Sequence, residues 1–119
     1  MINQFEVPDY LAHQLPELSS EIPAGKKGNM YRYMRLFLNH TNNKLREHNF
    51  RALKRCFLLA DDLYEQGNAV VKNTVENMFV FSFSQFFQYT KQEDKKELKE
   101  MIPTRLYDLY VNQVCHKGY

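Results

Sequence analysis

The chain has 119 residues, 44% of them hydrophobic and 25% charged, and a formal net charge of +2 at pH 7. Gly and Pro number only four each, which excludes a collagen-like, low-complexity or disordered chain. A chain of this length predicts one domain, residues 1–119, that folds without a metal or disulfide. Its two cysteines, Cys56 and Cys115, lack CxxC spacing and indicate a reducing compartment.

The sequence shows no signal for export or membrane insertion. The first 15 residues carry Glu6 and Asp9 and contain no continuous apolar run. The most apolar stretch, residues 78–87, is interrupted by Ser82, Ser84 and Gln85 and is shorter than the roughly 20 residues of a spanning helix. We therefore expect a cytoplasmic protein without a membrane-spanning segment.

Apolar residues recur every three or four positions, the spacing of amphipathic helices. This pattern predicts helices over residues 8–15, 29–44, 49–66, 68–89 and 103–116, and a short charged helix or turn over 91–100. Pro16, Pro23, Gly25 and Gly28 mark a loop after the first helix. Asn49 as N-cap and Gly67 as the glycine after the last turn delimit the third helix. The sequence thus predicts an all-α compact bundle of five or six helices, which paired antiparallel helical hairpins would satisfy.

The segment after Gly67 is expected to form the central helix of the bundle. Its main predicted apolar face consists of Val71, Val75, Met78, Phe79, Ser82, Phe86 and Tyr89. Val80, Phe81, Phe83 and Phe87 widen that face to almost the whole circumference, as in a helix surrounded by others. The last helix is expected to bury Leu106, Tyr107, Leu109, Tyr110 and Val114. We expect most of the aromatic residues to pack in the core, with one patch left for a partner or a second copy, drawn from Tyr31, Tyr107 and Tyr110 or from Val80, Phe83 and Phe87.

Charge is unevenly distributed along the chain. Residues 26–55 contain nine bases and one acid, Glu47, whereas residues 1–25 contain four acids and no Lys or Arg. Such a basic face attracts nucleic acid, an acidic protein or the chain's own N-terminal segment, but outward sides of amphipathic helices are also polar for structural reasons. No zinc-finger, RNP-like or helix-turn-helix pattern accompanies it. The candidate partner-binding residues are Arg32, Arg35, Arg46, Arg51, Lys54 and Arg55.

The residue types that carry catalysis do not form a recognisable set. The four histidines lack metal-ligand spacing, Cys115 beside His116 is only a sequence neighbour, and the Gly25-Lys26-Lys27 run lacks the upstream glycine of a phosphate loop. Asp61, Asp62 and Glu65 sit toward the C-terminal end of a predicted helix, where they require either a partner charge or solvent. We expect no enzyme, no cofactor and no bound metal.

Two segments resemble an uncharacterised family of short bacterial all-helical proteins. They are Gly67–Ser82, with the pattern GN..V.N..EN.F..S, and Ile102–Gln113, with the pattern P..L...Y..Q. The resemblance is best over residues 60–113 and implies no catalytic or ligand residue. Its polar positions are Asn73, Glu76, Asn77 and Gln113. They form either a recognition point or, as we favour, a structural feature: a solvent-facing edge of the helix, hydrogen bonds into the preceding loop, or a hydrogen bond that joins the two segments.

Some members of the family that these segments resemble look like immunity or partner-binding proteins from toxin neighbourhoods. The leading hypothesis is therefore a non-catalytic protein-interaction module, with immunity-type binding of a toxin as its most specific form. The alternative is a nucleic-acid-binding accessory protein that uses the basic face of residues 26–55. A homo-oligomer is compatible with either hypothesis.

Overall fold

The architecture was taken from a computed structural model, which describes residues 1–22 and 30–117 and the side chains as far as Cys115. The helices are α1 (Val7–Gln14), α2 (Met30–Arg46), α3 (Phe50–Gln66), α4 (Ala69–Thr74), α5 (Phe83–Tyr89), α6 (Lys95–Met101) and α7 (Thr104–Lys117). Short helical turns occur at η1 (Pro16–Leu18) and η4 (Gln92–Asp94). A wide π-helical turn, η2 (Val75–Phe79), and a tight turn, η3 (Val80–Ser82), join α4 to α5.

The described residues therefore form six helices, with α4–α5 counted as one, and the all-α prediction is confirmed. For the five longer predicted helices, the ends that fall within the described residues lie within two residues of the observed ones, whereas α6 begins at Lys95 rather than at residue 91. The predicted loop positions Pro23, Gly25 and Gly28, and the basic Lys26 and Lys27, lie outside the described residues.

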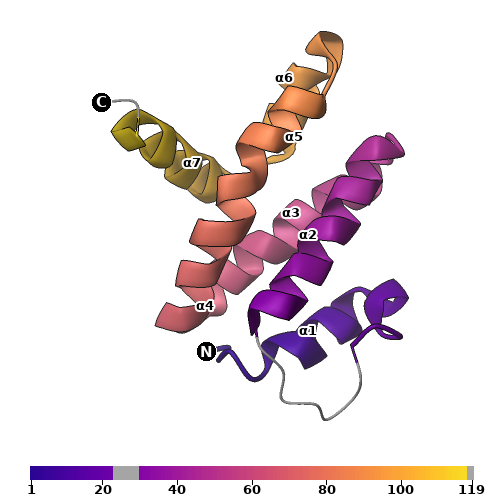
Figure 1. Cartoon of the computed structure of the whole chain (residues 1–119), viewed down its shortest axis with the longest axis vertical. Coiled ribbons are helices and arrows are strands. Elements are labelled where there is room, and N and C mark those ends of the chain that lie inside the picture. Colours follow the sequence, from indigo (N-terminus) through magenta and orange to yellow (C-terminus); the bar gives the residue numbers. More distant parts are fainter. Residues whose placement is uncertain (23–29, 118–119) are drawn as a thin grey trace.

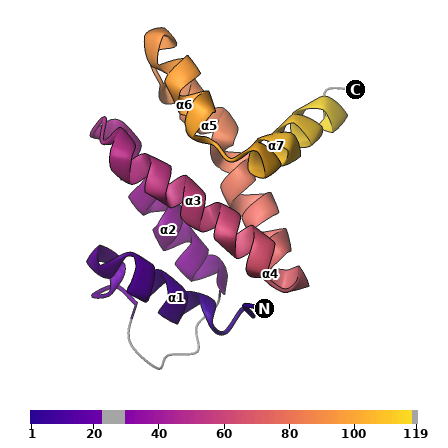
Figure 2. The ribbon, with the colours of Figure 1, turned by 180° about the vertical axis from the view of Figure 1, so that it is seen from behind.

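The helices are arranged in two layers. α2 and the α4–α5 helix lie in one layer, and α3, α6 and α7 lie in the other (Figures 1 and 2). The smallest dimension of the molecule is 18 Å, close to two helix diameters. α2 and α3 form an antiparallel hairpin, α1 packs against α2, and the chain reverses after α5 so that α6 runs back toward α7.

A tight corner joins α2 to α3. The backbone N–H groups of His48 and Asn49 donate to the carbonyls of Leu45 and Lys44, at 3.1 and 3.0 Å, and close the C-terminal end of α2. This closure places His48 at a φ of 55°, in the left-handed region. Asn49 then begins α3, because its side-chain oxygen accepts a hydrogen bond from the N–H of Ala52, as its sequence position predicts.

The junction between α3 and α4 is held by the N-terminal strand-like residue Ile2. Its N–H donates to the carbonyl of Gln66 at 2.7 Å, and its own carbonyl accepts from the N–H of Asn68 at 2.8 Å. Gly67 lies buried beneath this contact with an ordinary φ of −76°. Glycine is therefore required here because there is no space for a side chain. The left-handed conformation that a glycine after a helix usually adopts is not involved.

The core is built around Phe79, in the wide turn of the α4–α5 helix. Its ring stacks on that of Phe37 from α2, with centroids 5.0 Å apart, and meets those of Phe57, Phe83 and Phe86 within 6.3 Å. Phe37, Phe57, Phe79 and Phe83 have no exposed surface. The segment after Gly67 is thus central to the core, as its phenylalanine content predicts.

The wide turn changes which residues of this helix face the core. Buried positions recur at intervals of four: Val71, Val75, Phe79 and Phe83. In an ideal α-helix each such step would displace the side chain by about 40° around the helix axis. Because the π-helical turn absorbs this rotation, Thr90 is buried and Tyr89 is 71% exposed. The predicted burial of Tyr89 was wrong for this reason.

One further predicted position differs from the structure. Val114 is exposed because it lies on the far half of α7, which extends away from the other helices (Figure 1). Among the candidates for an aromatic patch, Val80 and Phe83 are fully buried, as core packing predicts, whereas Tyr31 is more than half exposed.

Candidate partner-binding site

Part of the predicted basic face forms a stripe along α2. Its members are all exposed and follow one another at intervals of three or four residues: Arg32, Arg35, Asn39, Asn43 and Arg46. We call this set the α2 stripe. Helix α2 contains no acidic residue, and among the described residues none of its three arginines has an ion-pair or hydrogen-bond partner.

The other predicted bases are engaged elsewhere. Arg55 donates to the main-chain carbonyl of Gln14 at 2.7 Å and so fixes the end of α1 on α3. Arg51 and Lys54 line a shallow depression together with two acids of α6, Glu97 and Glu100. Opposite charges at that depression balance, so the bases of residues 26–55 do not form one uniform cationic surface.

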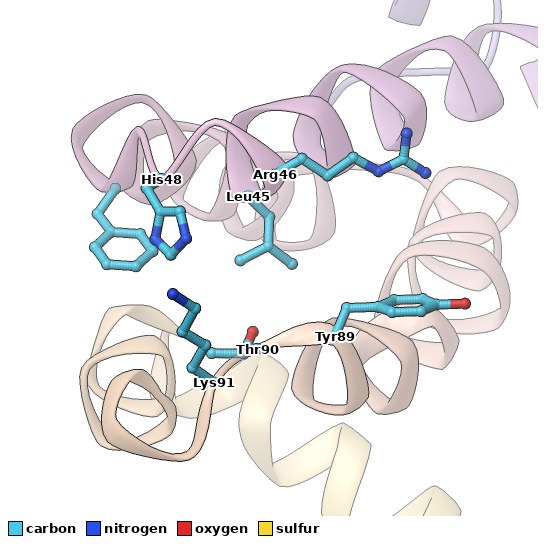
Figure 3. Close-up of a pocket in the computed structure, with 7 residues that line it drawn as sticks. Leu45, Arg46, His48, Tyr89, Thr90 and Lys91 are labelled. Carbon is cyan, nitrogen blue, oxygen red and sulfur yellow. The ribbon is translucent and has the colours of Figure 1, made fainter.

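A cleft opens where the α2–α3 corner faces the end of α5. It has a volume of about 390 Å³ and is lined by Leu45, Arg46, His48, Phe50, Tyr89, Thr90 and Lys91. Figure 3 shows Leu45 and Thr90 between its two walls, Arg46 above Tyr89 at one end, and Lys91 reaching toward His48 at the other. The cleft thus combines an apolar base with cationic groups at both ends.

Side-chain charges dominate the electrostatics of this cleft. The end of α2 adjoins the start of α3, and the end of α5 adjoins the turn that begins α6, so opposite helix dipole ends lie together and largely cancel. Asp94 lies 3.8 Å from His48 and provides it with a partner when the imidazole is protonated. Arg46 and Lys91 have no such partner among the described residues and are available to an anion.

The four polar family positions have different environments. The side-chain amide of Gln113 donates to the main-chain carbonyl of Glu76 at 2.8 Å, which joins α7 to the π-helical turn. Asn73 and Asn77 are exposed, and the Glu76 side chain takes no part in this bond. The expected bond between the two family segments is therefore present, but it accounts for Gln113 alone among the four side chains.

The acids at the end of α3 have a partner charge. Arg105 of α7 donates to both carboxylate oxygens of Asp61, at 2.8 and 3.3 Å, and to Glu65 at 3.0 Å. The hydrogen bond that Arg105 donates to the Asp61 carboxylate raises the pKa of Arg105 above its ordinary value. This cluster is structural, since it clamps α7 onto α3.

Other titratable groups lie apart from the cleft. Cys56 is fully buried, and burial raises the pKa of its thiol, which makes it a small core residue rather than a nucleophile. Cys115 is exposed. Within the described part of the chain, no three His, Cys, Asp or Glu side chains lie close enough to hold a metal ion. In the same residues, no helix has the length and apolar character needed to cross a bilayer.

Sequence reasoning identified Arg46 in the cleft but missed His48, Tyr89 and Lys91. The sequence places Tyr89 on the apolar face of its helix and Lys91 in the charged stretch of residues 91–100. Two separate corners supply these residues, so their proximity depends on tertiary packing rather than on spacing in the chain. The signal in the sequence is the charge of Lys91, two residues after the apolar helix ends at Tyr89.

The fold and surface define a small all-α domain with a basic helical stripe that ends in a cleft. Over residues 8–116 the sequence matches the family described as a domain of unknown function, DUF7674, and the chain belongs to this family. The match also spans the N-terminal half, where the sequence motifs were less distinctive. Searches of curated proteins and of solved structures gave no significant match.

Proposed function

We propose that the protein is a non-catalytic interaction module that binds an acidic surface of a protein partner through the α2 stripe. The observation that carries this proposal is the exposure of Arg32, Arg35 and Arg46 without internal partners in the described residues. Arg55 and Arg105, by contrast, are held by internal acceptors. Exposed guanidinium groups bind carboxylates in bidentate geometry. An acidic partner therefore gains more binding free energy from the arginines of α2 than from arginines that are already engaged within the protein.

The distribution of charge along the stripe specifies the partner further. Arg32 and Arg46 are separated by 14 residues, or about 20 Å of helix. The middle carries the amides of Asn39 and Asn43, beside two acids of the N-terminal region, Glu17 and Glu21. A complementary partner therefore has one acidic region on each side of a neutral centre. Partners with a uniformly charged surface should bind less tightly.

Nucleic-acid binding is less well supported. A polyanion favours a continuous row of bases, but Arg51 and Lys54 face acids of α6 and Arg55 is bound to Gln14. Glu17 and Glu21 beside the stripe would repel a phosphate backbone.

The experiment compares the charge reversals Arg32→Glu and Arg35→Glu, made together, with Lys95→Glu and Lys96→Glu on α6. Both double variants change the net charge equally, and the α6 substitutions place acids at a helix start, where they are tolerated. Affinity capture from the native host should yield a protein with the wild type and the α6 variant but not with the α2 variant. Equal capture by all three proteins would reject the α2 stripe as the binding surface.

A salt series with duplex and single-stranded DNA tests the alternative. At physiological salt, we expect the wild type and the α2 variant to bind DNA equally weakly or not at all. Salt-sensitive binding lost specifically in the α2 variant would favour the nucleic-acid function instead.

Immunity-type binding of a toxin in the cytoplasm is the most specific form of the proposal, and it is supported by the resemblance described above. It predicts that co-expression of the wild type restores growth to cells that express a toxin encoded beside the gene. The α2 variant should fail to restore growth, whereas the α6 variant should succeed.

A further inference from the structure

The cleft at the end of the α2 stripe has an apolar base. Leu45 and Thr90 are both less than 10% exposed and lie between the two walls (Figure 3). The hydroxyl of Thr90 donates to the carbonyl of Phe86 at 2.6 Å, so its hydrogen is already engaged. Phe50 extends the apolar surface, with its ring 5.6 Å from that of His48 in an edge-on arrangement. An apolar group entering the cleft would displace water from this base.

The two ends of the cleft are cationic. Arg46 and the exposed Tyr89 lie at one end, and Lys91 and His48 at the other (Figure 3). The nearby acid Asp94 is directed at His48, which leaves Arg46 and Lys91 to interact with an incoming carboxylate. A positive group at each end of an apolar base is complementary to an apolar group with a negative charge on each side.

We infer that this cleft receives an apolar side chain of the partner protein that is flanked by acidic residues in the partner's sequence. The inference rests on the proposed function, because Arg46 belongs both to the α2 stripe and to the cleft. The volume of about 390 Å³ lies within the range of ligand-binding clefts and is adequate for one large side chain. Such buried anchors contribute most of the affinity of protein interfaces, while surrounding charges set orientation.

The absence of tryptophan from the chain makes a direct test possible, because the fluorescence of an indole then reports on the probe alone. The probe is the capped pentapeptide Glu-Glu-Trp-Glu-Glu, titrated with the full-length protein at low salt. We expect a saturable blue shift of the indole emission. The peptide Gln-Gln-Trp-Gln-Gln should bind about tenfold more weakly, and Glu-Glu-Ala-Glu-Glu should not compete at equal concentration.

Variants locate the binding to the cleft. Arg46→Gln with Lys91→Gln should weaken the acidic probe about tenfold without changing the Gln-flanked peptide. The matched control, Lys95→Gln with Lys96→Gln, removes the same charge from α6 and should leave both titrations unchanged. If the cleft double variant loses helicity, Lys91→Gln alone, at an exposed turn residue, provides the same comparison.

Three results would overturn the inference: no saturable shift at millimolar protein, equal binding of the acidic and Gln-flanked peptides, or unchanged binding by the cleft variants. Its failure is separable from failure of the proposed function. Loss of partner capture by the Arg32/Arg35 variant together with no probe binding would reject the cleft alone. Probe binding that depends on Arg46 and Lys91, with capture unaffected by the α2 reversal, would instead reject the stripe.

Discussion

The side-chain amide of Gln113 donates a hydrogen bond to the main-chain carbonyl of Glu76, and the two atoms are 2.8 Å apart. Gln113 is on α7 and Glu76 is in the wide turn of the α4–α5 helix. Wide turns displace backbone groups from the regular i→i−4 hydrogen bonds, and the N–H of Val80 here donates to the carbonyl of Val75, five residues earlier. The amide of Gln113 thus connects α7 to the irregular part of the central helix.

Replacement of Gln113 should therefore affect stability through the carbonyl of Glu76 and not through its side chain. Gln113→Ala leaves this half-buried carbonyl without its donor, and we expect a loss of about 1 kcal/mol, or a melting temperature roughly 4 °C lower. Glu76→Ala keeps the carbonyl and should change stability by less than about 0.5 kcal/mol. Thermal unfolding followed by circular dichroism measures both.

The exposed Asn73 and Asn77 are matched controls for this pair. Their alanine variants should unfold like the wild type. A large loss of stability in Glu76→Ala, with none in Gln113→Ala, would contradict the assignment of the hydrogen bond.

Gly67 should tolerate no side chain. A Cβ at this position would lie 2.5 Å from the carbonyl oxygen of Leu63 and 2.5 Å from a methyl group of Val71. The carbonyl belongs to the backbone of α3 and cannot move away alone, so Gly67→Ala should cost about 1–3 kcal/mol. Chemical denaturation measures this cost, with the exposed neighbour change Gln66→Ala as control. Wild-type stability of the glycine variant would show that the junction with Ile2 is adjustable.

The helices could be predicted from sequence because each depends on local signals. The apolar spacing of α2 and α3 and the cap at Asn49 act over one or two turns, and all three appear in the structure. The N-terminal start of α4 similarly follows from Asn68, whose side-chain oxygen accepts from the N–H of Val71 at 3.0 Å. Local information was adequate for the fold class.

The exposure of Tyr89 could not be predicted because it depends on the π-helical turn ten or more residues earlier. In a regular helix, with 100° per residue, Tyr89 would lie on the same face as the buried Val71. The wide turn shifts the buried face by one residue, so that Thr90 is buried instead. The cleft was missed for a related reason. It joins Arg46 to Lys91, and only the packing of two corners brings residues so distant in sequence together.

Arg105 and Asp61 form a contact that the sequence left open. Three acids near the end of a helix indicated either a partner charge or exposure to solvent, and for Asp61 a residue 44 positions later supplies the charge. Because the Arg105 side chain is 43% exposed, solvent screens the pair. A double-mutant cycle of Arg105→Ala and Asp61→Ala should give a coupling free energy of about 0.5–1 kcal/mol.

High salt provides the control for this cycle, since about 1 M NaCl should reduce the coupling between these exposed groups. Arg105→Lys should retain only part of it, because an ammonium cannot contact both oxygens of Asp61 in the same fixed geometry. A coupling of zero at low salt would show that the clamp contributes nothing to the stability of α7 on α3.

His40 should make the stability of the protein depend on pH. Its side chain is only 9% exposed, and burial lowers its pKa below 6.5, although Glu17, 3.9 Å from its Nε2, acts in the opposite direction. Lys44 also lowers this pKa, while Glu47 and Glu21 raise it. Since the folded state holds the proton less tightly than the unfolded state, the unfolded chain binds more protons in the window between the lowered pKa and 6.5.

The free energy of unfolding should therefore be greatest above pH 6.5 and decrease as the pH falls through 6.5 toward the lowered pKa of His40. Urea denaturation of the wild type and His40→Gln at intervals from pH 5 to pH 8 isolates this contribution as the difference between the two proteins. As the pH falls, the free energy of unfolding of the wild type should decrease relative to that of His40→Gln, because glutamine cannot be protonated. A shift in favour of the wild type would mean that the ion pair with Glu17 outweighs burial and that the folded-state pKa of His40 is raised instead.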